Sequence, residues 1–258
     1  MFTAEIQFRI VRTTDDDAVV RGVYGLFSAW RGNGQILNDE WPLAKSRSVV
    51  RAFVTIPERT SLQRKRDNKS VTQQRNDLAD VGLAQPTTTT LGHDPTSIHP
   101  CRCAEQSAYI LYTDHHSMES PLRCAECFGS IPLYRIPHTT GGRSYDDIIF
   151  WRSTYQDCDA LEIGCSVGER FATRQMVLVN SPLSTMGIEC CQRITDVTKK
   201  PCYYRLYRYY GRSKKQEAQR RCPSCGRKWR LKDPWHVLFD FRCDRCHLLS
   251  NYAHSIDM

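Results

Sequence analysis

The sequence has no long hydrophobic run and no export signal. It contains no stretch of about 18 apolar residues, the length that a helix needs to cross a bilayer. The N-terminal segment alternates apolar and polar residues, and it lacks the basic start and apolar block that are typical of a signal peptide. We therefore expect no membrane partner, and we predict a cytosolic protein.

The common sequence motifs of enzymes are also missing. There is no phosphate-binding glycine loop, no nucleophile elbow and no H-E-x-x-H motif. The acids Asp146 and Asp147 are better explained as a helix start, and Glu169 with Arg170 as an ion pair. An enzymatic activity stays open but has no positive support, and we infer no small-molecule substrate.

Cysteine, in contrast, is abundant, with 13 cysteines among 258 residues. In an oxidising compartment such residues form disulfides, whereas in a reducing one they bind metals or pack as buried thiols. The odd number, the missing export signal and the paired C-x-x-C spacings all favour the reduced form. The cysteines therefore indicate metal binding.

The strongest motif lies near the C-terminus, where Cys222 and Cys225 are followed by Cys243 and Cys246. A C-x-x-C turn directs two sulfurs at one point, and two facing turns complete a tetrahedron around Zn²⁺. Four thiolates leave no open coordination position. The motif therefore predicts a zinc ribbon with a structural metal ion.

The residues around this motif fit a ribbon as well. Gly226, directly after the second cysteine, lets the backbone turn tightly and leaves amides free to bond sulfur. We expect the two ribbon strands at residues 228–231 and 237–242. A module of this size lacks a core of its own, so zinc should contribute directly to its folding.

A second zinc site is predicted from Cys101, Cys103, Cys124 and Cys127. We expect a strand after each pair, at residues 108–113 and 130–136, with Gly129 following the second knuckle. The C-x-C half is less standard, so a nearby histidine is an alternative ligand: His93, His99, His115 or His116. The other five cysteines are expected to be buried thiols: Cys158, Cys165, Cys190, Cys191 and Cys202.

One segment carries most of the positive charge. Residues 199–232 contain 13 Lys or Arg and a single acid, Glu217, in a chain of net charge +8. Cations that neutralise phosphates, beside rings that stack on bases, are typical of surfaces that bind RNA or single strands. The predicted nucleic-acid contacts are Arg205, Arg208, Arg212, Lys214, Lys215, Arg220, Arg227, Lys228, Trp229 and Arg230.

The charge and the rings of this segment are also compatible with a structural role or with a protein partner. A zinc ion with four thiolates has a formal charge of −2, which neighbouring arginines can simply offset. Tyr204 and Tyr210 can belong to the core of a strand at residues 202–210. A protein partner is the alternative to nucleic acid, with the ribbon acting as a docking scaffold or as a regulatory or immunity-type adaptor.

The hydrophobic pattern predicts an α+β protein with an N-terminal ferredoxin-like two-layer unit, helical segments and one or two zinc ribbons. In unit 1–85 we expect a strand at the N-terminus, a helix starting at residues 14–17, and strands at 35–41 and 49–56. Ser70 and Gln73 suggest a capping box. The predicted divisions are a small α/β domain at 1–85, a linker at 86–100, a first zinc ribbon at 101–140, a mainly helical region at 141–200 and the basic C-terminal ribbon module at 201–258.

Several motifs together resemble a known family. These are SPLRCAECFG at 120–129, PLYRIP at 132–137, GERFA at 168–172, RCPSCG at 221–226, and FDFRCDRC with LLSN at 239–251. GQI at 34–36 and WPL at 41–43 extend the likeness to nearly the whole chain. The sequence is similar to uncharacterised bacterial proteins described as zinc-ribbon-containing and as candidate nucleic-acid binders. The resemblance implies zinc on the four C-terminal cysteines. It also implies that residues 87–90 and 141–142 lie in loops that vary within the family.

Overall fold

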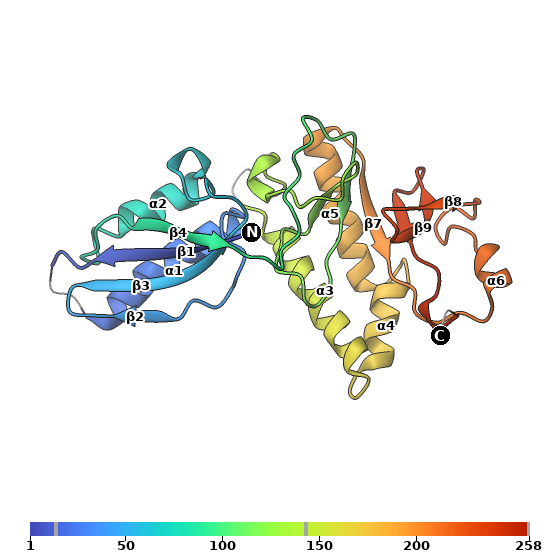
Figure 1. Ribbon diagram of the computed structural model, residues 1–258, viewed down its shortest axis with the longest axis horizontal. Coiled ribbons are helices and arrows are strands. Elements are labelled where there is room, and N and C mark those ends of the chain that lie inside the picture. Colours follow the sequence, from blue (N-terminus) through green and yellow to red (C-terminus); the bar gives the residue numbers. More distant parts are fainter. Residues whose placement is uncertain (13–14, 142–143, 257–258) are drawn as a thin grey trace. The chain divides into compact units, whose positions relative to one another are not determined.

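The computed structural model describes residues 1–12, 15–141 and 144–256, which form two compact units (Figure 1). Unit 1 comprises Met1–Pro100, Met118–Ser120 and Ser130–Asp146, and unit 2 comprises the remaining segments. Each unit combines helices with a β-sheet, so the α+β class expected from the sequence is confirmed. All 13 cysteines lie in unit 2.

Unit 1 is built on a four-stranded antiparallel sheet with the strand order β2-β3-β1-β4. The alternation in β1 places Ala4, Ile6 and Phe8 on the buried face, because successive side chains of a strand point to opposite sides. The strands are β1 (Phe2–Arg9), β2 (Leu43–Lys45), β3 (Val49–Ile56) and β4 (Thr87–His93).

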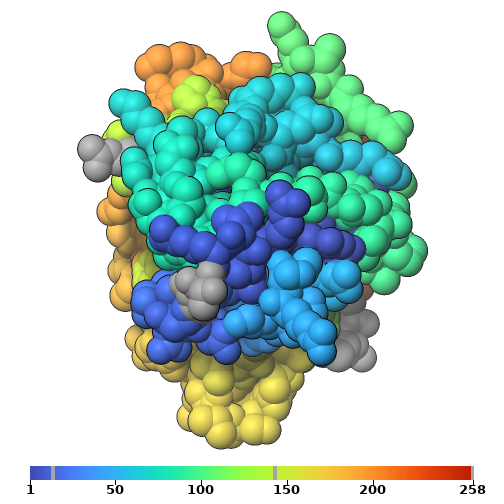
Figure 2. All heavy atoms as spheres, turned by 90° about the vertical axis from the view of Figure 1, so that its left-hand side faces the viewer, coloured from blue at the N-terminus to red at the C-terminus, as the bar shows by residue number. Residues whose placement is uncertain are grey.

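Two helices, α1 (Asp16–Gly32) and α2 (Lys69–Asp77), pack against the buried face of this sheet. Helix α1 starts after Asp15, whose carboxylate accepts a hydrogen bond from the amide of Ala18 at 2.5 Å. The predicted acidic helix start is therefore correct, although Thr14 lies outside the described residues. In Figure 2 the N-terminal residues are dark blue, and the β2–β3 segment beside them is light blue.

The second strand of unit 1 is not where the sequence pattern placed it. Residues 35–41 form no strand, and β2 follows at Leu43–Lys45. Gln35 is fully buried, and its side-chain amide donates to the carbonyl of Ser61 at 2.8 Å and to Asp67 at 3.0 Å. The amide of Leu37 still donates to the carbonyl of Thr55 on β3 at 2.9 Å, so the segment contacts the sheet without forming a ladder.

Two further expectations for unit 1 are corrected. Helix α2 is capped by Asn68, which accepts from the amide of Val71 at 2.9 Å, so Ser70 lies inside the helix and forms no capping box. Thr87–His93, expected to be linker, is edge strand β4 and pairs with β1. Threonine is β-branched and favours extended backbone, which explains why a polar tract forms a strand.

Unit 2 contains a six-stranded sheet with the order β6-β5-β7-β10-β9-β8. Its central strand β7 runs parallel to both neighbours, whereas the outer pairs are antiparallel. The strands that flank both cysteine groups therefore belong to one sheet. The strands are β5 (Tyr109–Leu111), β6 (Leu122–Cys124), β7 (Cys202–Leu206), β8 (Arg230–Trp235), β9 (Phe239–Cys243) and β10 (Leu248–Ser250).

The three long helices of unit 2, α3, α4 and α5, lie beside β7 (Figure 1). A methyl group on Gly187 of α5 would lie 2.1 Å from the Tyr204 ring, so only glycine lets α5 approach β7 this closely. Helix α3 ends at Gly164, and α5 begins at Pro182. The helices are α3 (Asp146–Gly164), α4 (Glu169–Val177), α5 (Pro182–Thr198) and the short α6 (Lys214–Ala218).

Residues 130–136, predicted as a strand after the second knuckle, instead contain the 3-10 turn η2 (Leu133–Arg135) of unit 1. Pro132 and Pro137 bracket this turn, and proline cannot donate to a β-ladder. Two further 3-10 turns are η1 (Arg64–Arg66) and η3 (His254–Ile256). Gly142, of the glycine pair assigned to loop variation, lies outside the described residues. Among the described helices, none has both the length and the apolar character to span a membrane.

Candidate metal centres

The C-terminal cysteine group comes together as the spacing predicts. The four Sγ atoms of Cys222, Cys225, Cys243 and Cys246 all lie within 4.8 Å of one another, and none forms a disulfide. The sulfurs of Cys225 and Cys243 are 3.6 Å apart. Zinc–sulfur bonds of about 2.3 Å in a tetrahedron place sulfurs about 3.8 Å apart, so the group has the size of a metal site.

The first knuckle of this group is a tight hydrogen-bonded turn. The amide of Gly226 donates to the carbonyl of Cys222 at 2.9 Å, and the amide of Cys222 donates to the carbonyl of Arg227 at 3.0 Å. Gly226 has φ +70°, in the left-handed region that glycine adopts without strain. The predicted role of this glycine is therefore confirmed.

The second knuckle starts where β9 ends, at Cys243, and leads into β10. His247, directly after the last cysteine, has φ 49°, so it occupies the left-handed position that Gly226 holds in the first knuckle. The carbonyl of His247 accepts a hydrogen bond from the amide of Tyr204 at 2.9 Å. This bond fixes the knuckle to the central strand β7.

The N-terminal group brings Cys101, Cys103, Cys124 and Cys127 within the same 4.8 Å limit. Its C-x-x-C knuckle repeats the C-terminal pattern, because the amide of Phe128 donates to the carbonyl of Cys124 at 2.9 Å. Phe128 has φ 57° and takes the place of the knuckle glycine. Within the described part of the chain, the sulfurs form this group without a histidine.

The C-x-C half is held by close backbone packing. A methyl group on Gly129 would lie 2.8 Å from the backbone nitrogen of Cys101, so glycine is required at this contact. The Gly129 amide also donates to the sulfur of Cys127 at 3.4 Å. The side chain of Gln106 donates to the sulfur of Cys101 at 3.6 Å and to the carbonyl of Cys103 at 3.0 Å. Such bonds orient a cysteine ligand.

The thiols of both groups have shifted pKa values. A hydrogen bond from the backbone of Arg227 lowers the pKa of Cys225 to about 7. Burial raises the pKa of Cys243 to about 12 and also raises that of Cys124. Metal ligation needs thiolates, so a bound cation has to overcome this desolvation at the buried cysteines.

The two groups share a small apolar core along the sheet of unit 2. Phe128 of the first knuckle packs 5.8 Å from the ring of Phe239 on β9, and 5.1 Å from that of His236 in the β8–β9 turn. His236 and Val237 both have positive φ, at 54° and 63°. The buried residues of this core are Ala108, Ile110, Ala125, Tyr203, Phe239 and Leu249.

Four of the ten predicted nucleic-acid contacts make intramolecular contacts that stabilise the fold. Arg205 lies 4.9 Å from the ring centroid of Tyr112. Arg208 and Arg220 both contact the buried carboxylate of Glu217, at 2.8 and 3.3 Å. Trp229 is 3 % exposed, and its indole nitrogen donates to the carbonyl of Arg220 at 3.1 Å.

Arg220 is the central residue of this framework. Its guanidinium lies 4.2 Å from the ring centroid of Phe241 and donates to the carbonyl of Asn251 at 2.7 Å. Burial lowers the pKa of Arg220 to about 10, which still leaves it charged at neutral pH. Its charge serves the packing between α6, β9 and β10.

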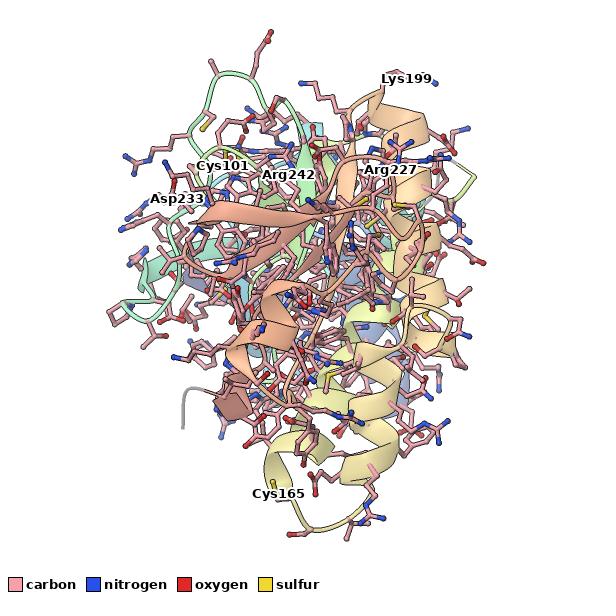
Figure 3. The ribbon with its side chains drawn as sticks, turned by 90° about the vertical axis from the view of Figure 1, so that its right-hand side faces the viewer. Cys101, Cys165, Lys199, Arg227, Asp233 and Arg242 are labelled. Carbon is pink, nitrogen blue, oxygen red and sulfur yellow. The ribbon has the colours of Figure 1, made fainter. Side chains whose placement is uncertain are left out.

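The other six predicted contacts are exposed: Arg212, Lys214, Lys215, Arg227, Lys228 and Arg230. Figure 3 views this side of unit 2, with Arg227 labelled. The structure adds residues that the charge pattern missed. A hollow of about 470 Å³ is lined by Lys214, Lys215, Ala218, Arg230, Tyr252 and Ile256. A second, of about 340 Å³, is lined by Ala218, Gln219, Arg220, Arg221, Lys228, Trp229 and Arg230.

The remaining cysteines are buried except for one. Cys158, Cys190, Cys191 and Cys202 are buried thiols, as predicted. Cys165 is exposed in the turn between α3 and α4, where Figure 3 labels it. The prediction for Cys165 is wrong because α3 ends one residue earlier and the chain leaves the helix packing there.

Three family models match successive parts of the chain. Residues 103–207 match a domain of unknown function (DUF2310), residues 1–92 match DUF8589 and residues 211–256 match DUF8594. An uncharacterized protein of Haemophilus influenzae is 33% identical over 262 residues, covering 98% of each chain. The chain belongs to this bacterial family. A second uncharacterized protein of that organism is 36% identical over 167 residues, covering 63% of this chain and 80% of the relative.

Two different family models cover the two cysteine groups. The match at 211–256 contains the whole C-terminal group, whereas DUF2310 contains three of the four N-terminal cysteines together with α3, α4 and α5. The resemblance to an uncharacterised bacterial family is thereby confirmed. Its two cysteine groups are sites that could hold metal ions.

Proposed function

We propose that this protein binds two structural zinc ions and uses its basic C-terminal module to bind single-stranded nucleic acid, RNA or DNA. The two cysteine groups support the metal ions, and the exposed cations of the C-terminal module support the anionic partner.

The donor sets support zinc. Each group offers four sulfurs and no oxygen, and tetrahedral sets of four thiolates are typical of zinc. Because four ligands close the coordination shell, the ions are structural. The knuckle amides and Gln106, which bond to sulfurs in the N-terminal group, stabilise the thiolate form. Metal analysis of the purified protein is expected to find two zinc ions per chain, and a single ion would contradict the N-terminal site.

The exposed cations support an anionic partner. Lys214, Lys215, Lys228 and Arg230 line two neighbouring hollows that share Ala218. The one acid of the basic segment, Glu217, is 3 % exposed and is bound by two arginines, so it does not offset these charges. This retained positive surface is the observation that carries the proposal.

The shape of the module favours single strands over duplex. Helix α6 has five residues, Lys214–Ala218, which is too short to act as a recognition helix in a major groove. Hollows lined by cations and a ring suit unpaired nucleotides instead, whose bases are free to stack. Sequence readout by base pairs is not part of the proposal.

Fluorescence anisotropy with labelled decauridine and decathymidine tests this function. If about four phosphates are neutralised, raising the salt from 50 to 200 mM should weaken binding about 50-fold, because counterion release governs affinity. No binding at 50 mM salt would overturn the proposal and favour the alternative, in which the module docks a protein. The double variant Lys65→Ala/Lys69→Ala removes two exposed charges from unit 1 and is expected to bind normally.

We also propose that unit 1 is a ferredoxin-like domain. Its β-α-β-β-α-β element order and the strand order β2-β3-β1-β4 support the assignment. Cross-strand nuclear Overhauser contacts from Ile6 to both Ala52 and Thr88 are expected, because β1 lies between β3 and β4. Contacts to only one of these partners would contradict the assignment.

A further inference from the structure

We propose that the hollow beside Tyr252 holds one unpaired nucleotide of the bound strand, with its base against Tyr252 and Arg230 and its phosphate near Lys214 and Lys215. This inference rests on the proposed function, because it names the residues that bind the base. Tyr252 lies outside the basic segment of residues 199–232. Its role comes from the fold.

The hollow has a suitable size and lining. Its volume of about 470 Å³ is within the range of about 300–1,000 Å³ that is usual for small-ligand sites. Lys214, Lys215 and Arg230 provide the positive charge, while Tyr252, Ile256 and Ala218 provide apolar surface. A nucleotide has the same two parts, an anionic phosphate and a flat base.

Tyr252 is fixed in place before any ligand binds. Its ring packs 5.2 Å from the ring of Phe241, which in turn packs 5.3 Å from Trp229. Its backbone amide donates to the carboxylate of Asp240 at 2.7 Å. A ring that is already ordered loses little conformational freedom when a base stacks on it, so more of the stacking energy becomes affinity.

Arg230 belongs to the same wall of the hollow. Its guanidinium lies 5.6 Å from the ring centroid of Tyr252. A guanidinium plane can stack on a base as an aromatic ring does, and it brings a positive charge as well. Tyr252 and Arg230 therefore form one stacking surface, and Arg230 provides its positive charge.

Among the described residues that line the hollow, none has a carboxylate side chain that would repel the phosphate. Helix α6 begins after Ser213, whose hydroxyl accepts from the amide of Gln216 at 3.3 Å, and this places Lys214 and Lys215 at the hollow. Glu217 of the same helix is buried beneath Arg208 and Arg220. Asp240 bonds to the backbone of Tyr252.

The neighbouring hollow continues the path. It shares Ala218 and Arg230 with the Tyr252 hollow and adds the exposed cations Arg221 and Lys228. A strand whose base lies at Tyr252 therefore meets further positive charge at the next nucleotide. This continuity favours a strand over a free nucleotide as the occupant.

The test compares Tyr252→Ala with Tyr252→Phe in the full-length, zinc-loaded protein, using labelled decauridine at 50 mM salt. Stacking contributes about 1–3 kcal/mol per base, so the alanine variant should bind at least fivefold more weakly. The phenylalanine variant should bind within twofold of the wild type. Unlabelled uridine monophosphate, added as a competitor, distinguishes a free nucleotide from a strand. We expect it to displace no decauridine at about 1 mM, which is the upper end of the usual range of KM values for small substrates.

Three controls keep the outcome clear. Zinc content and thermal unfolding of each variant show whether the module is intact. Lys214→Ala/Lys215→Ala changes only exposed side chains and should also weaken binding at least fivefold, whereas Lys65→Ala/Lys69→Ala should not. Photo-crosslinking with 5-iodouridine, followed by peptide mass spectrometry, should identify Tyr252 as the attached residue.

The outcomes separate the two proposals. If the wild type binds decauridine but Tyr252→Ala and Lys214→Ala/Lys215→Ala bind equally well, the strand lies elsewhere and this inference is wrong, while the proposed function stands. Displacement by uridine monophosphate would overturn the strand as occupant. If the wild type binds no oligonucleotide, both the function and the subsite fail.

Discussion

The Nε2 atom of His236 lies 2.8 Å from the carbonyl oxygen of Ala125, which joins the β8–β9 turn to the knuckle of the N-terminal cysteine group. The strand that leaves this turn, β9, ends at Cys243 of the C-terminal group. The same turn packs its His236 ring against Phe128. Two cysteine groups that are separate in sequence therefore share one contact surface, and we expect the stabilities of their proposed metal centres to be coupled.

This coupling predicts that damage to one centre loosens the other. Cys225→Ser should abolish the C-terminal centre and also make the N-terminal centre lose zinc several times faster to a chelator. His236→Ala should do so more mildly, because a single hydrogen bond contributes about 0.5–1.5 kcal/mol. Zinc content after graded exposure to the chelator measures both effects.

Cys165→Ser is the matched control for that experiment, because Cys165 is exposed and belongs to neither group. It should keep both ions as firmly as the wild type. If Cys225→Ser retains its N-terminal zinc with wild-type kinetics, the centres are independent and the shared core has no energetic consequence.

Removal of all metal is predicted to unfold the sheet of unit 2 and to leave unit 1 folded. Unit 1 has no cysteine, and its own core includes Ile6, Phe27 and Trp30, all fully buried. Hydrogen exchange in a chelator should show fast exchange in β8, β9 and β10 and persistent protection in β1 and β3. Loss of protection in β1 would show that unit 1 depends on the metal.

The cysteine groups were predictable because a metal imposes a local rule. Tetrahedral ligation requires pairs of sulfurs at short spacing, and the C-x-x-C and C-x-C pairs satisfy it within a few residues. The expectation that a glycine follows each C-x-x-C knuckle holds for only one of the three knuckles. Phe128 and His247 occupy the same left-handed position as Gly226, held there by hydrogen bonds to Cys124 and Tyr204.

The parts that sequence analysis missed depend on long-range contacts. Residues 35–41 form no strand because Gln35 bonds to Ser61 and Asp67, which no local pattern reveals. Tyr252 joins the basic hollow because the chain following β10 passes beside β9, where its backbone bonds to Asp240. Trp229 has the composition of a stacking residue, but it lies in the core beneath Arg220.

His138 is predicted to make the stability of unit 1 depend on pH. Its Nε2 atom lies 3.0 Å from the side-chain oxygen of Asn33, its ring stacks on Tyr145, and burial lowers its pKa. Because the folded state favours the neutral ring, the unfolded state binds the proton more readily. The stability is therefore complete above the ordinary histidine pKa of about 6.5 and declines as the pH falls below it.

Urea unfolding of the wild type and of His138→Gln between pH 7.5 and 5.5 measures this effect. The glutamine variant keeps a side-chain donor but cannot titrate, so it should lose less stability over that range. Equal slopes for the two proteins would assign the pH dependence to other groups. Tyr145 cannot account for a decline in this range, because burial raises its pKa still further above neutrality.

Gly187→Ala is predicted to be strongly destabilising. The added methyl group would meet the Tyr204 ring at 2.1 Å and the Trp151 indole nitrogen at 2.5 Å, and both rings are buried. Overpacking of this kind costs about 1–3 kcal/mol, which corresponds to a decrease in Tm of about 2–12 °C for a chain of this size. Gly164→Ala, where nothing lies within 4 Å, is the matched control and should not lower the Tm. A Gly187→Ala protein with wild-type Tm would show that α5 and β7 are less closely packed than described.

Val237→Gly is predicted to stabilise the β8–β9 turn. Val237 has φ 63°, which is unfavourable for a β-branched residue, and its side chain is 91 % exposed, so glycine relieves the strain with almost no loss of packing. The left-handed conformation costs an L-residue about 1–2 kcal/mol, and the greater freedom of glycine in the unfolded chain offsets part of this gain. Calorimetry should therefore show a modest rise in the Tm of unit 2, whereas Val20→Gly, at an exposed position in helix α1, should lower the stability of unit 1. A fall in the Tm of unit 2 for Val237→Gly would mean that the Val237 side chain makes stabilising contacts within the folded protein.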